Sequence, residues 1–92
     1  MAENATGGIR SLVIKVGGSL AETGRLPSAI ALIESARVPV IVVPGGGPFA
    51  DNVRALQPTL KFDDATAHRL AMLSMHQMAE MIVAQGRRLR IV

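Results

Sequence analysis

Two glycine-rich stretches and one lysine are the residues of this chain whose types and spacing suit chemistry. Lys15 lies just before Gly17-Gly18-Ser19, and a second stretch, Gly45-Gly46-Gly47, is flanked by prolines. Glycine permits positive φ and lets a ligand approach the backbone closely, and successive N–H groups in such turns attract anions. The N-terminus of a following helix adds partial positive charge. Each stretch is therefore suited to hold a phosphate or a carboxylate.

Lys15 is the strongest candidate for a catalytic residue. It occurs within Leu-Val-Ile-Lys-Val, a run that is otherwise apolar. A lysine in a buried strand costs free energy unless its ammonium group finds a partner or reaches solvent. From this position the ammonium group can extend toward the first glycine stretch, where it would neutralise charge on a transferring phosphoryl group. The alternative is a structural lysine that reaches solvent at the rim of a sheet.

The elements that must position these residues alternate between strand and helix. Residues 11–16 and 38–43 are short, apolar and β-branched, which is typical of strands buried on both faces of a parallel sheet. Apolar periodicity predicts helices over 26–37, 49–56 and 63–85. This order predicts an α/β fold, a three-layer αβα sandwich with a mainly parallel sheet, incomplete in this chain. Ligands of such sheets bind beyond the carboxyl ends of the strands, where both glycine stretches lie.

Boundary residues refine these elements. Pro58 is expected to close the second helix, and either Asp63 or Asp64 can cap the third. Gly86 suits the end of that third helix. Residues 89–92 predict the beginning of a third strand.

Polar side chains follow the second glycine stretch at the start of the next helix. We interpret Asp51 and Arg54 as substrate-binding residues, with Arg54 pairing with an anion. Ordinary solvation of a first helical turn is the alternative.

The second stretch also fits a dinucleotide-binding pattern. Gly45, Gly47 and Ala50 match Gly-x-Gly-x-x-Gly/Ala, and Asp63 or Asp64 would be the acid that binds a ribose. That acid should end a second strand, whereas here it begins a helix, so a nicotinamide site is disfavoured. The Gly-x-x-x-x-Gly-Lys-Ser/Thr pattern of Walker-type loops does not occur.

The last predicted helix is rich in methionine. Its broad apolar surface predicts packing in a core or between subunits, and its methionines are Met72, Met75, Met78 and Met81. His68 and His76 are separated by about two helical turns without a completing ligand set, so no metal site is predicted. His68 or Arg69 is a candidate for the substrate pocket if this helix passes under the glycine loops.

Composition limits the partners that we expect. The net charge is +3, but tyrosine and tryptophan are absent, so the basic residues at 87, 88 and 90 lack a stacking platform for single-stranded nucleic acid. No run of about 18 apolar residues predicts a membrane helix. The lack of cysteine fits a cytoplasmic protein. Residues 1–8 are small and polar, which predicts a flexible tail before a domain over 9–92.

The two glycine motifs together resemble those of the amino acid kinase superfamily. They read Val-Ile-Lys-Val-Gly-Gly-Ser-Leu at 13–20 and Val-Val-Pro-Gly-Gly-Gly-Pro-Phe-Ala-Asp at 42–51. The stretch 64–79 is similar to a narrower branch, the kinases of aminomethyl-furan-methanol phosphate in methanofuran biosynthesis. The resemblance implies that Lys15 contacts the transferring phosphoryl group. It also implies that Gly17, Gly18 and Ser19 hold the nucleotide phosphates, and that Gly45, Gly46 and Gly47 hold the acceptor.

The resemblance also implies the reaction and its partners. Such kinases use ATP and Mg²⁺ to phosphorylate a carboxylate, phosphate or similar oxygen, and they continue into a C-terminal half that binds the nucleotide. We therefore expect an ATP-dependent phosphotransferase for a small carboxylate- or phosphate-bearing metabolite, with this chain as the N-terminal, acceptor-binding half. It would work as a homo-oligomer or with a partner chain that supplies the other half. The sequence leaves open a fragment, a split-kinase subunit or a degenerate copy.

Two other functions remain open on the same scaffold. One is a non-catalytic anion-binding or storage protein. The other is a regulatory or assembly subunit that works through the methionine-rich helix.

Overall fold

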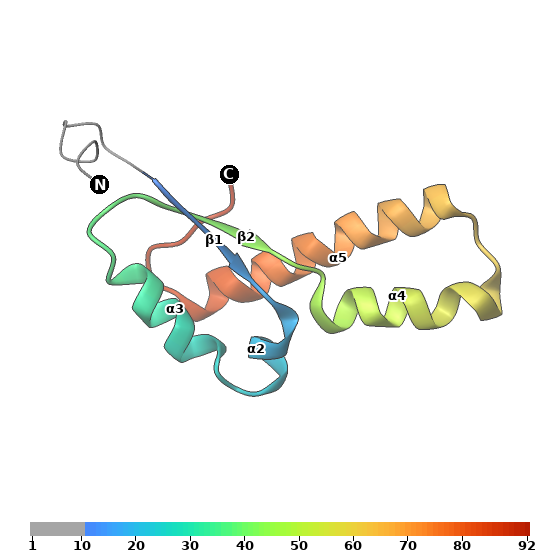
Figure 1. The fold of residues 1–92 in the computed structure, drawn as a ribbon, viewed down its shortest axis with the longest axis horizontal. Helices are drawn as coiled ribbons and strands as arrows, with labels where there is room; N and C mark the ends of the chain where they lie inside the picture. Colours follow the sequence, from blue (N-terminus) through green and yellow to red (C-terminus); the bar gives the residue numbers. More distant parts are fainter. Residues whose placement is uncertain (1–10) are drawn as a thin grey trace.

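The computed structural model describes residues 11–92, which form a two-stranded parallel sheet with helices packed on one face (Figure 1). The tail expected at 1–8 lies outside the described residues. Strand β1 (Leu12–Val16) pairs with β2 (Val40–Pro44) in a register that matches Leu12 with Val40 and Val16 with Pro44. Both strands therefore end at the same edge of the sheet. The α/β class and the parallel strands are confirmed.

Four helices complete the described chain, and their bounds are α2 Gly18–Glu22, α3 Leu26–Glu34, α4 Gly47–Leu60 and α5 Asp64–Gln85. The short helix α2 was not expected, because glycine and serine are weak helix formers. Helix α3 is shorter than expected. It ends at Ser35, whose hydroxyl donates to the Leu32 carbonyl at 2.6 Å, so local side-chain bonding competes with a further helical turn.

Helix α4 continues past the proline that was expected to close it. Pro58 lies inside its last turn, and the helix ends at Lys61, a left-handed residue with φ 57° whose N–H donates to the Gln57 carbonyl at 2.7 Å. The fixed φ of proline is itself helical, and so close to the end only one backbone hydrogen bond is lost. The prediction that Pro58 ends the helix was wrong.

Asp63 is the residue that caps α5. Its carboxylate accepts the Thr66 N–H at 2.8 Å, and hydrogen bonds from the Thr66 side chain and backbone lower the pKa of Asp63. The negative charge also lies at the positive end of the helix dipole. At the other end Gly86 is the C-cap, as expected, with an extended backbone.

The core lies between the sheet and the two helices that cover it. Ile30 of α3 and Ile82 of α5 pack with Val16 of β1, and Ile14 and Val42 on the same sheet face lie against this cluster. Helices α4 and α5 run as an antiparallel pair that extends away from the sheet (Figure 1). The fold thus places the sheet edge and the start of α4 beside the middle of α5.

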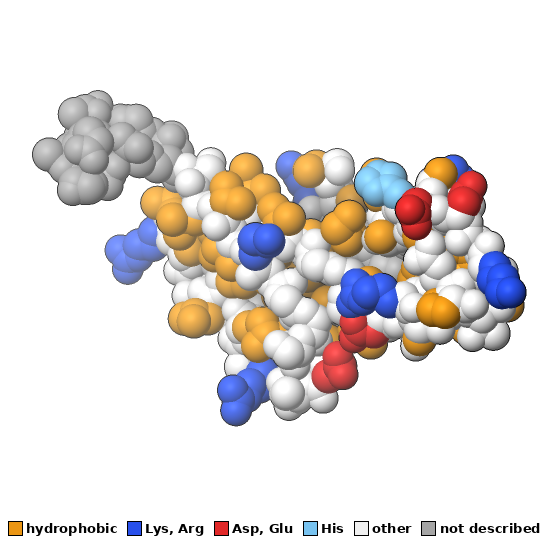
Figure 2. All heavy atoms as spheres, turned by 45° about the vertical axis from the view of Figure 1, so that its right-hand side comes forward, with side chains coloured by type: hydrophobic (Ala, Val, Ile, Leu, Met, Phe, Trp, Pro, Cys, Tyr) orange, Lys and Arg blue, Asp and Glu red, His pale blue; other side chains and the backbone are white. Residues whose placement is uncertain are grey.

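The other face of the sheet is bare, which corrects the expectation that both strands are buried on two sides. Val13 is 65% exposed, Ile41 53% and Val43 39%, and Lys15 is exposed beside them. Figure 2 shows hydrophobic side chains open to solvent on the half of the molecule that carries the sheet. The radius of gyration is 16.2 Å, against about 12 Å for a compact domain of this length. Residues 11–92 supply the sheet and one helical layer of the expected sandwich.

The C-terminal segment does not form the expected third strand. The Glu34 carboxylate accepts the backbone N–H groups of Arg87 at 2.8 Å, Arg88 at 2.6 Å and Leu89 at 3.2 Å. These donors would otherwise be available to a sheet ladder. The Arg88 N–H, supported by those of Arg87 and Leu89, lowers the pKa of Glu34 although partial desolvation opposes it.

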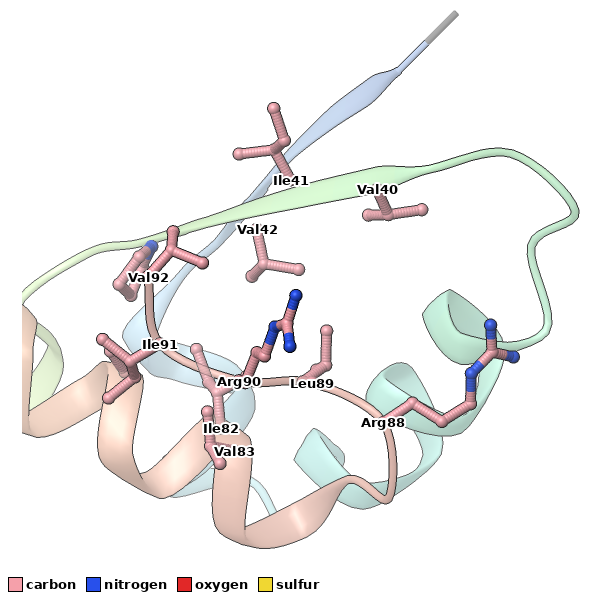
Figure 3. A pocket seen from close by; sticks show the side chains of 12 residues that line it. Val40, Ile41, Val42, Ile82, Val83, Arg88, Leu89, Arg90, Ile91 and Val92 are labelled. Carbon is pink, nitrogen blue, oxygen red and sulfur yellow. The ribbon is translucent and has the colours of Figure 1, made fainter. Parts of the chain in front are cut away.

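A groove of about 450 Å³ separates this segment from the free edge of β2. Val40 and Val42 point into it, toward the C-terminal segment, whereas Ile41 points to the opposite side of the strand (Figure 3). Arg90 extends into the space between the two segments (Figure 3). No helix in the described chain is long and apolar enough to cross a membrane.

Candidate functional site

The two glycine stretches meet at the carboxyl edge of the sheet. A Cβ atom on Gly18 would collide with the backbone of Gly47, so the two glycine stretches touch directly at positions that lack side chains. The Gly45 N–H donates to the Val16 carbonyl at 3.1 Å and continues the strand pairing into the loop. Both stretches therefore form one continuous backbone surface, as their positions after parallel strands predict.

Helix α5 supports the second stretch from below. A Cβ atom on Gly47, which has φ +59°, would lie 2.8 Å from the Met78 sulfur, and a Cβ on Gly46 would lie 3.5 Å from the Ser74 Cβ. Met78 is fully buried and Ser74 is 2% exposed. The Ser74 hydroxyl donates to the Leu70 carbonyl at 2.9 Å, so this small residue brings no unpaired polar group to the contact. Glycine is strongly favoured at position 47, because other residues rarely adopt this φ.

Gly17 and Gly45 differ from their neighbours because space is open beside them. A Cβ on Gly17 would meet no atom of the described chain within 4 Å, and one on Gly45 would only touch the Val16 carbonyl at 3.8 Å. Gly17 has φ −83° and ψ 157°, which any residue can adopt. Packing within residues 11–92 therefore does not explain why these two positions are glycine. Close approach of a ligand to the backbone would require glycine at such positions.

Lys15 lies on the bare face of the sheet, next to Val43 in the strand register. Its side chain is exposed, which corrects the expectation of a lysine within a buried strand. The surrounding apolar residues of this face, Val13 and Ile41, are exposed as well. A layer that covered this face would place the ammonium group in a low-dielectric setting, where its attraction for a phosphoryl group is stronger.

The remaining predicted site residues lie on exposed surfaces next to the loops. Ser19 occupies the first turn of α2 and is exposed. Asp51 and Arg54 lie in α4 and form an ion pair with each other. Their side chains are 60% and 71% exposed, so the pair contributes little to stability and the guanidinium can exchange partners.

Two other predicted features are not brought to the loops. His68 and Arg69 are exposed near the start of α5, and Arg69 donates to the Thr66 hydroxyl at 3.1 Å. Helix α5 meets the loops through Ser74 and Met78 instead. Sequence reasoning missed this role, although a serine within an apolar helix was a usable signal. Asp63 and Asp64 begin α5 rather than end a strand, so the dinucleotide pattern has no structural support.

Metal ligands are sparse in the part of the chain that the structure describes. No group of three or more His, Cys, Asp or Glu side chains is placed to hold a metal ion within residues 11–92. Asp51, the acidic residue that follows the second glycine stretch, is already paired with Arg54. These residues do not by themselves form a Mg²⁺ site.

Comparison with known proteins agrees with this geometry. The family model described as "Amino acid kinase family" matches residues 10–91. The chain belongs to the amino acid kinase family. The match includes both glycine stretches, Lys15 and the supporting helix α5, so the features that meet at the sheet edge are all within the kinase-family region.

One curated protein is similar to most of this chain. It is the [5-(aminomethyl)furan-3-yl]methyl phosphate kinase of Methanocaldococcus jannaschii, which is 31% identical over 77 residues. The aligned region covers 80% of this chain and 35% of the relative, so the chain spans about a third of that kinase. The resemblance to the branch of aminomethyl-furan-methanol phosphate kinases is confirmed at the level of similarity.

Proposed function

We propose that this chain is the phosphate-loop and acceptor-binding half of an ATP-dependent phosphotransferase. The observation that supports this most directly is the contact between Gly18 and Gly47, which joins two anion-binding loops at one sheet edge. Beside that contact, Gly17 and Gly45 leave the backbone open to a ligand. Two anionic groups held side by side are what transfer of a phosphoryl group between them requires.

The proposed roles follow the family pattern. Gly17, Gly18 and Ser19 hold the phosphates of ATP, and the second stretch holds the acceptor, with Asp51 and Arg54 as further substrate-binding residues. Lys15 neutralises charge on the transferring group. The acceptor is a small carboxylate- or phosphate-bearing metabolite. A phosphate-bearing acceptor is favoured, because the name of the M. jannaschii relative describes a phosphate kinase.

The nucleotide site must be completed by residues outside 11–92. The open backbone at Gly17 fits the phosphates of ATP, whereas residues 11–92 do not supply a carboxylate cluster for Mg²⁺. A C-terminal half, in the same polypeptide or a partner chain, would cover Lys15 on the bare face and add to the free edge of β2. Homo-oligomerisation and a cytoplasmic location stay predictions.

The test is complementation. The part of the M. jannaschii kinase beyond the aligned region is purified and mixed with this chain or fused to it. ATP-dependent phosphorylation of [5-(aminomethyl)furan-3-yl]methyl phosphate is then measured through the release of ADP. The proposal expects turnover by the combined protein and little or none by either part. Turnover by this chain alone would contradict the idea that it is a half. No turnover in the fusion, with both parts folded, would contradict the kinase assignment for this chain.

A non-catalytic anion-binding protein is the second candidate, supported by the same open backbone at Gly17 and Gly45. It predicts phosphate binding by the chain without turnover in any combination. Replacing Lys15 with Met distinguishes the two, because a kinase loses most of its turnover whereas a storage protein need not lose binding.

A further inference from the structure

We propose that Met78 is the positioning residue that sets the acceptor loop, an inference that deepens the proposed function and rests on it. Met78 lies in α5 and is fully buried, so its side chain is not exposed to a ligand in the loops. It acts through Gly47, where its sulfur occupies the space that a side chain would need.

The contact is specific in shape. A Cβ on Gly47 would lie 2.8 Å from the Met78 sulfur and 3.3 Å from its Cγ, so the thioether lies directly against the α-carbon of the loop. The same Cβ would also lie 3.4 Å from the Gly18 α-carbon. Gly47 is thus close to both the first glycine stretch and Met78. A flexible unbranched side chain suits this irregular gap better than a β-branched one.

Gly47 also determines the direction in which α4 leaves the loop. Gly47 is the first residue of α4 and adopts a left-handed φ of +59°, so it fixes the angle at which the chain turns from the loop into the helix. The N–H groups of a first helical turn point back toward the preceding loop, and in α4 every residue of that turn except Pro48 has one. A shift of Met78 would therefore change where these donors lie relative to Gly45, whose backbone is open to the acceptor.

Other methionines of α5 provide a matched control. Met72 is 54% exposed, against 0% for Met78, although both lie on the same helix. Truncation of Met72 removes a similar side chain without removing the support of the loop.

The experiment uses the full chain and two readouts. Amide hydrogen exchange of Gly45 and Ala50, whose N–H groups donate to the Val16 and Gly46 carbonyls, is measured by NMR in Met78→Ala, Met78→Leu and Met72→Ala, together with amides at the centre of α5. Titration with inorganic phosphate then follows the Gly17 and Gly45 amide signals. We expect loop exchange in Met78→Ala to rise at least tenfold relative to α5, phosphate affinity to fall several-fold, Met78→Leu to be intermediate, and Met72→Ala to match the wild type.

The outcomes separate the two proposals. Equal acceleration of all amides, with unchanged phosphate affinity, would show that Met78 only stabilises the fold and would overturn its positioning role. If Met78→Ala does not fold, Met78→Leu is used instead, because replacement of Met by Leu is well tolerated in protein cores. Its loop amides are compared with its α5 amides in the same way. If the wild-type chain binds no phosphate, the anion site of the proposed function is contradicted. The loop exchange measured without ligand still decides the role of Met78.

Discussion

Gly18 and Gly47 touch backbone to backbone, although α3 and β2 lie between them in the chain. The contact exists because β1 and β2 are parallel and end in register, with Val16 beside Pro44. Each strand then turns directly into a helix, so the two turns have no room for side chains where they meet. The proposed nucleotide and acceptor loops are therefore packed directly against each other as one structural unit.

Replacing Gly18 with Ala tests this unit. The added methyl group would collide with the Gly47 backbone, and we expect a loss of about 1–3 kcal/mol in the free energy of unfolding, as for other overpacked sites. Gly17→Ala is the matched control, since its methyl group meets no described atom. It should change stability by less than about 0.5 kcal/mol. Urea denaturation measures both variants.

The same pair separates structure from ligand binding. If a phosphate group approaches the backbone at Gly17, then Gly17→Ala should weaken binding of inorganic phosphate while the protein stays as stable as the wild type. Equal phosphate affinity in Gly17→Ala and wild type would argue that the open space at Gly17 is not used by this ligand.

Local chemistry made much of the fold predictable. Both strands, the glycine turns after them and the long helix from Asp63 or Asp64 to Gln85 follow from residue types within a few positions, and each was found within about two residues. The meeting of the loops also followed, because parallel strands share their carboxyl edge.

The predictions that were wrong concern features that depend on residues far apart in the chain. Apolar residues such as Val13 and Ile41 predict burial on both faces, but burial needs a second layer, which residues 11–92 do not supply. Leu89-Arg90-Ile91-Val92 has the composition of a strand, yet the Glu34 carboxylate takes up the N–H group of Leu89. The support of Gly47 by Met78 likewise joins α4 to α5 and has no local signature.

Glu34 should make stability depend on pH through its hold on the C-terminal segment. Its pKa is lowered in the folded protein, so it contributes stability above the unfolded pKa, near 4.5, and this contribution is lost as pH falls through the folded pKa. Glu34→Gln should therefore lower the urea midpoint at pH 7 and have a smaller effect at pH 3. Glu22→Gln, at an exposed position, should shift neither midpoint. A Glu34→Gln deficit that is equal at both pH values would contradict a role for the charge.

Asp63 provides a separate test at the start of α5. Asp63→Ala removes the acceptor of the Thr66 N–H and should lower the thermal midpoint, whereas Asp63→Asn keeps an N-cap acceptor and should retain most of the stability. Because hydrogen bonds from Thr66 lower the pKa of Asp63, the wild-type advantage over Asp63→Asn should begin to shrink below the unfolded pKa, about 3.8, and be lost as pH falls through the lower folded pKa. Thermal melts of the three proteins at pH 7 and pH 2.5 measure this. An Asn variant as unstable as the Ala variant would mean that the charge matters more than the cap.

Lys15 is the residue whose substitution bears most directly on the chemistry. Its side chain is exposed in this chain, so Lys15→Met should leave the free energy of unfolding within about 0.5 kcal/mol of the wild type. In the fusion with the C-terminal part of the M. jannaschii kinase, we expect turnover to fall by about 10²–10³-fold, the cost of removing one group that stabilises transition-state charge. Arg37→Met removes an exposed positive charge elsewhere and controls for net charge. Because neutralisation of the transferring group is needed at the transition state, the loss should occur in kcat more than in KM. A Lys15→Met fusion with wild-type kcat would exclude Lys15 from the transfer step and leave it as a lysine at the rim of the sheet.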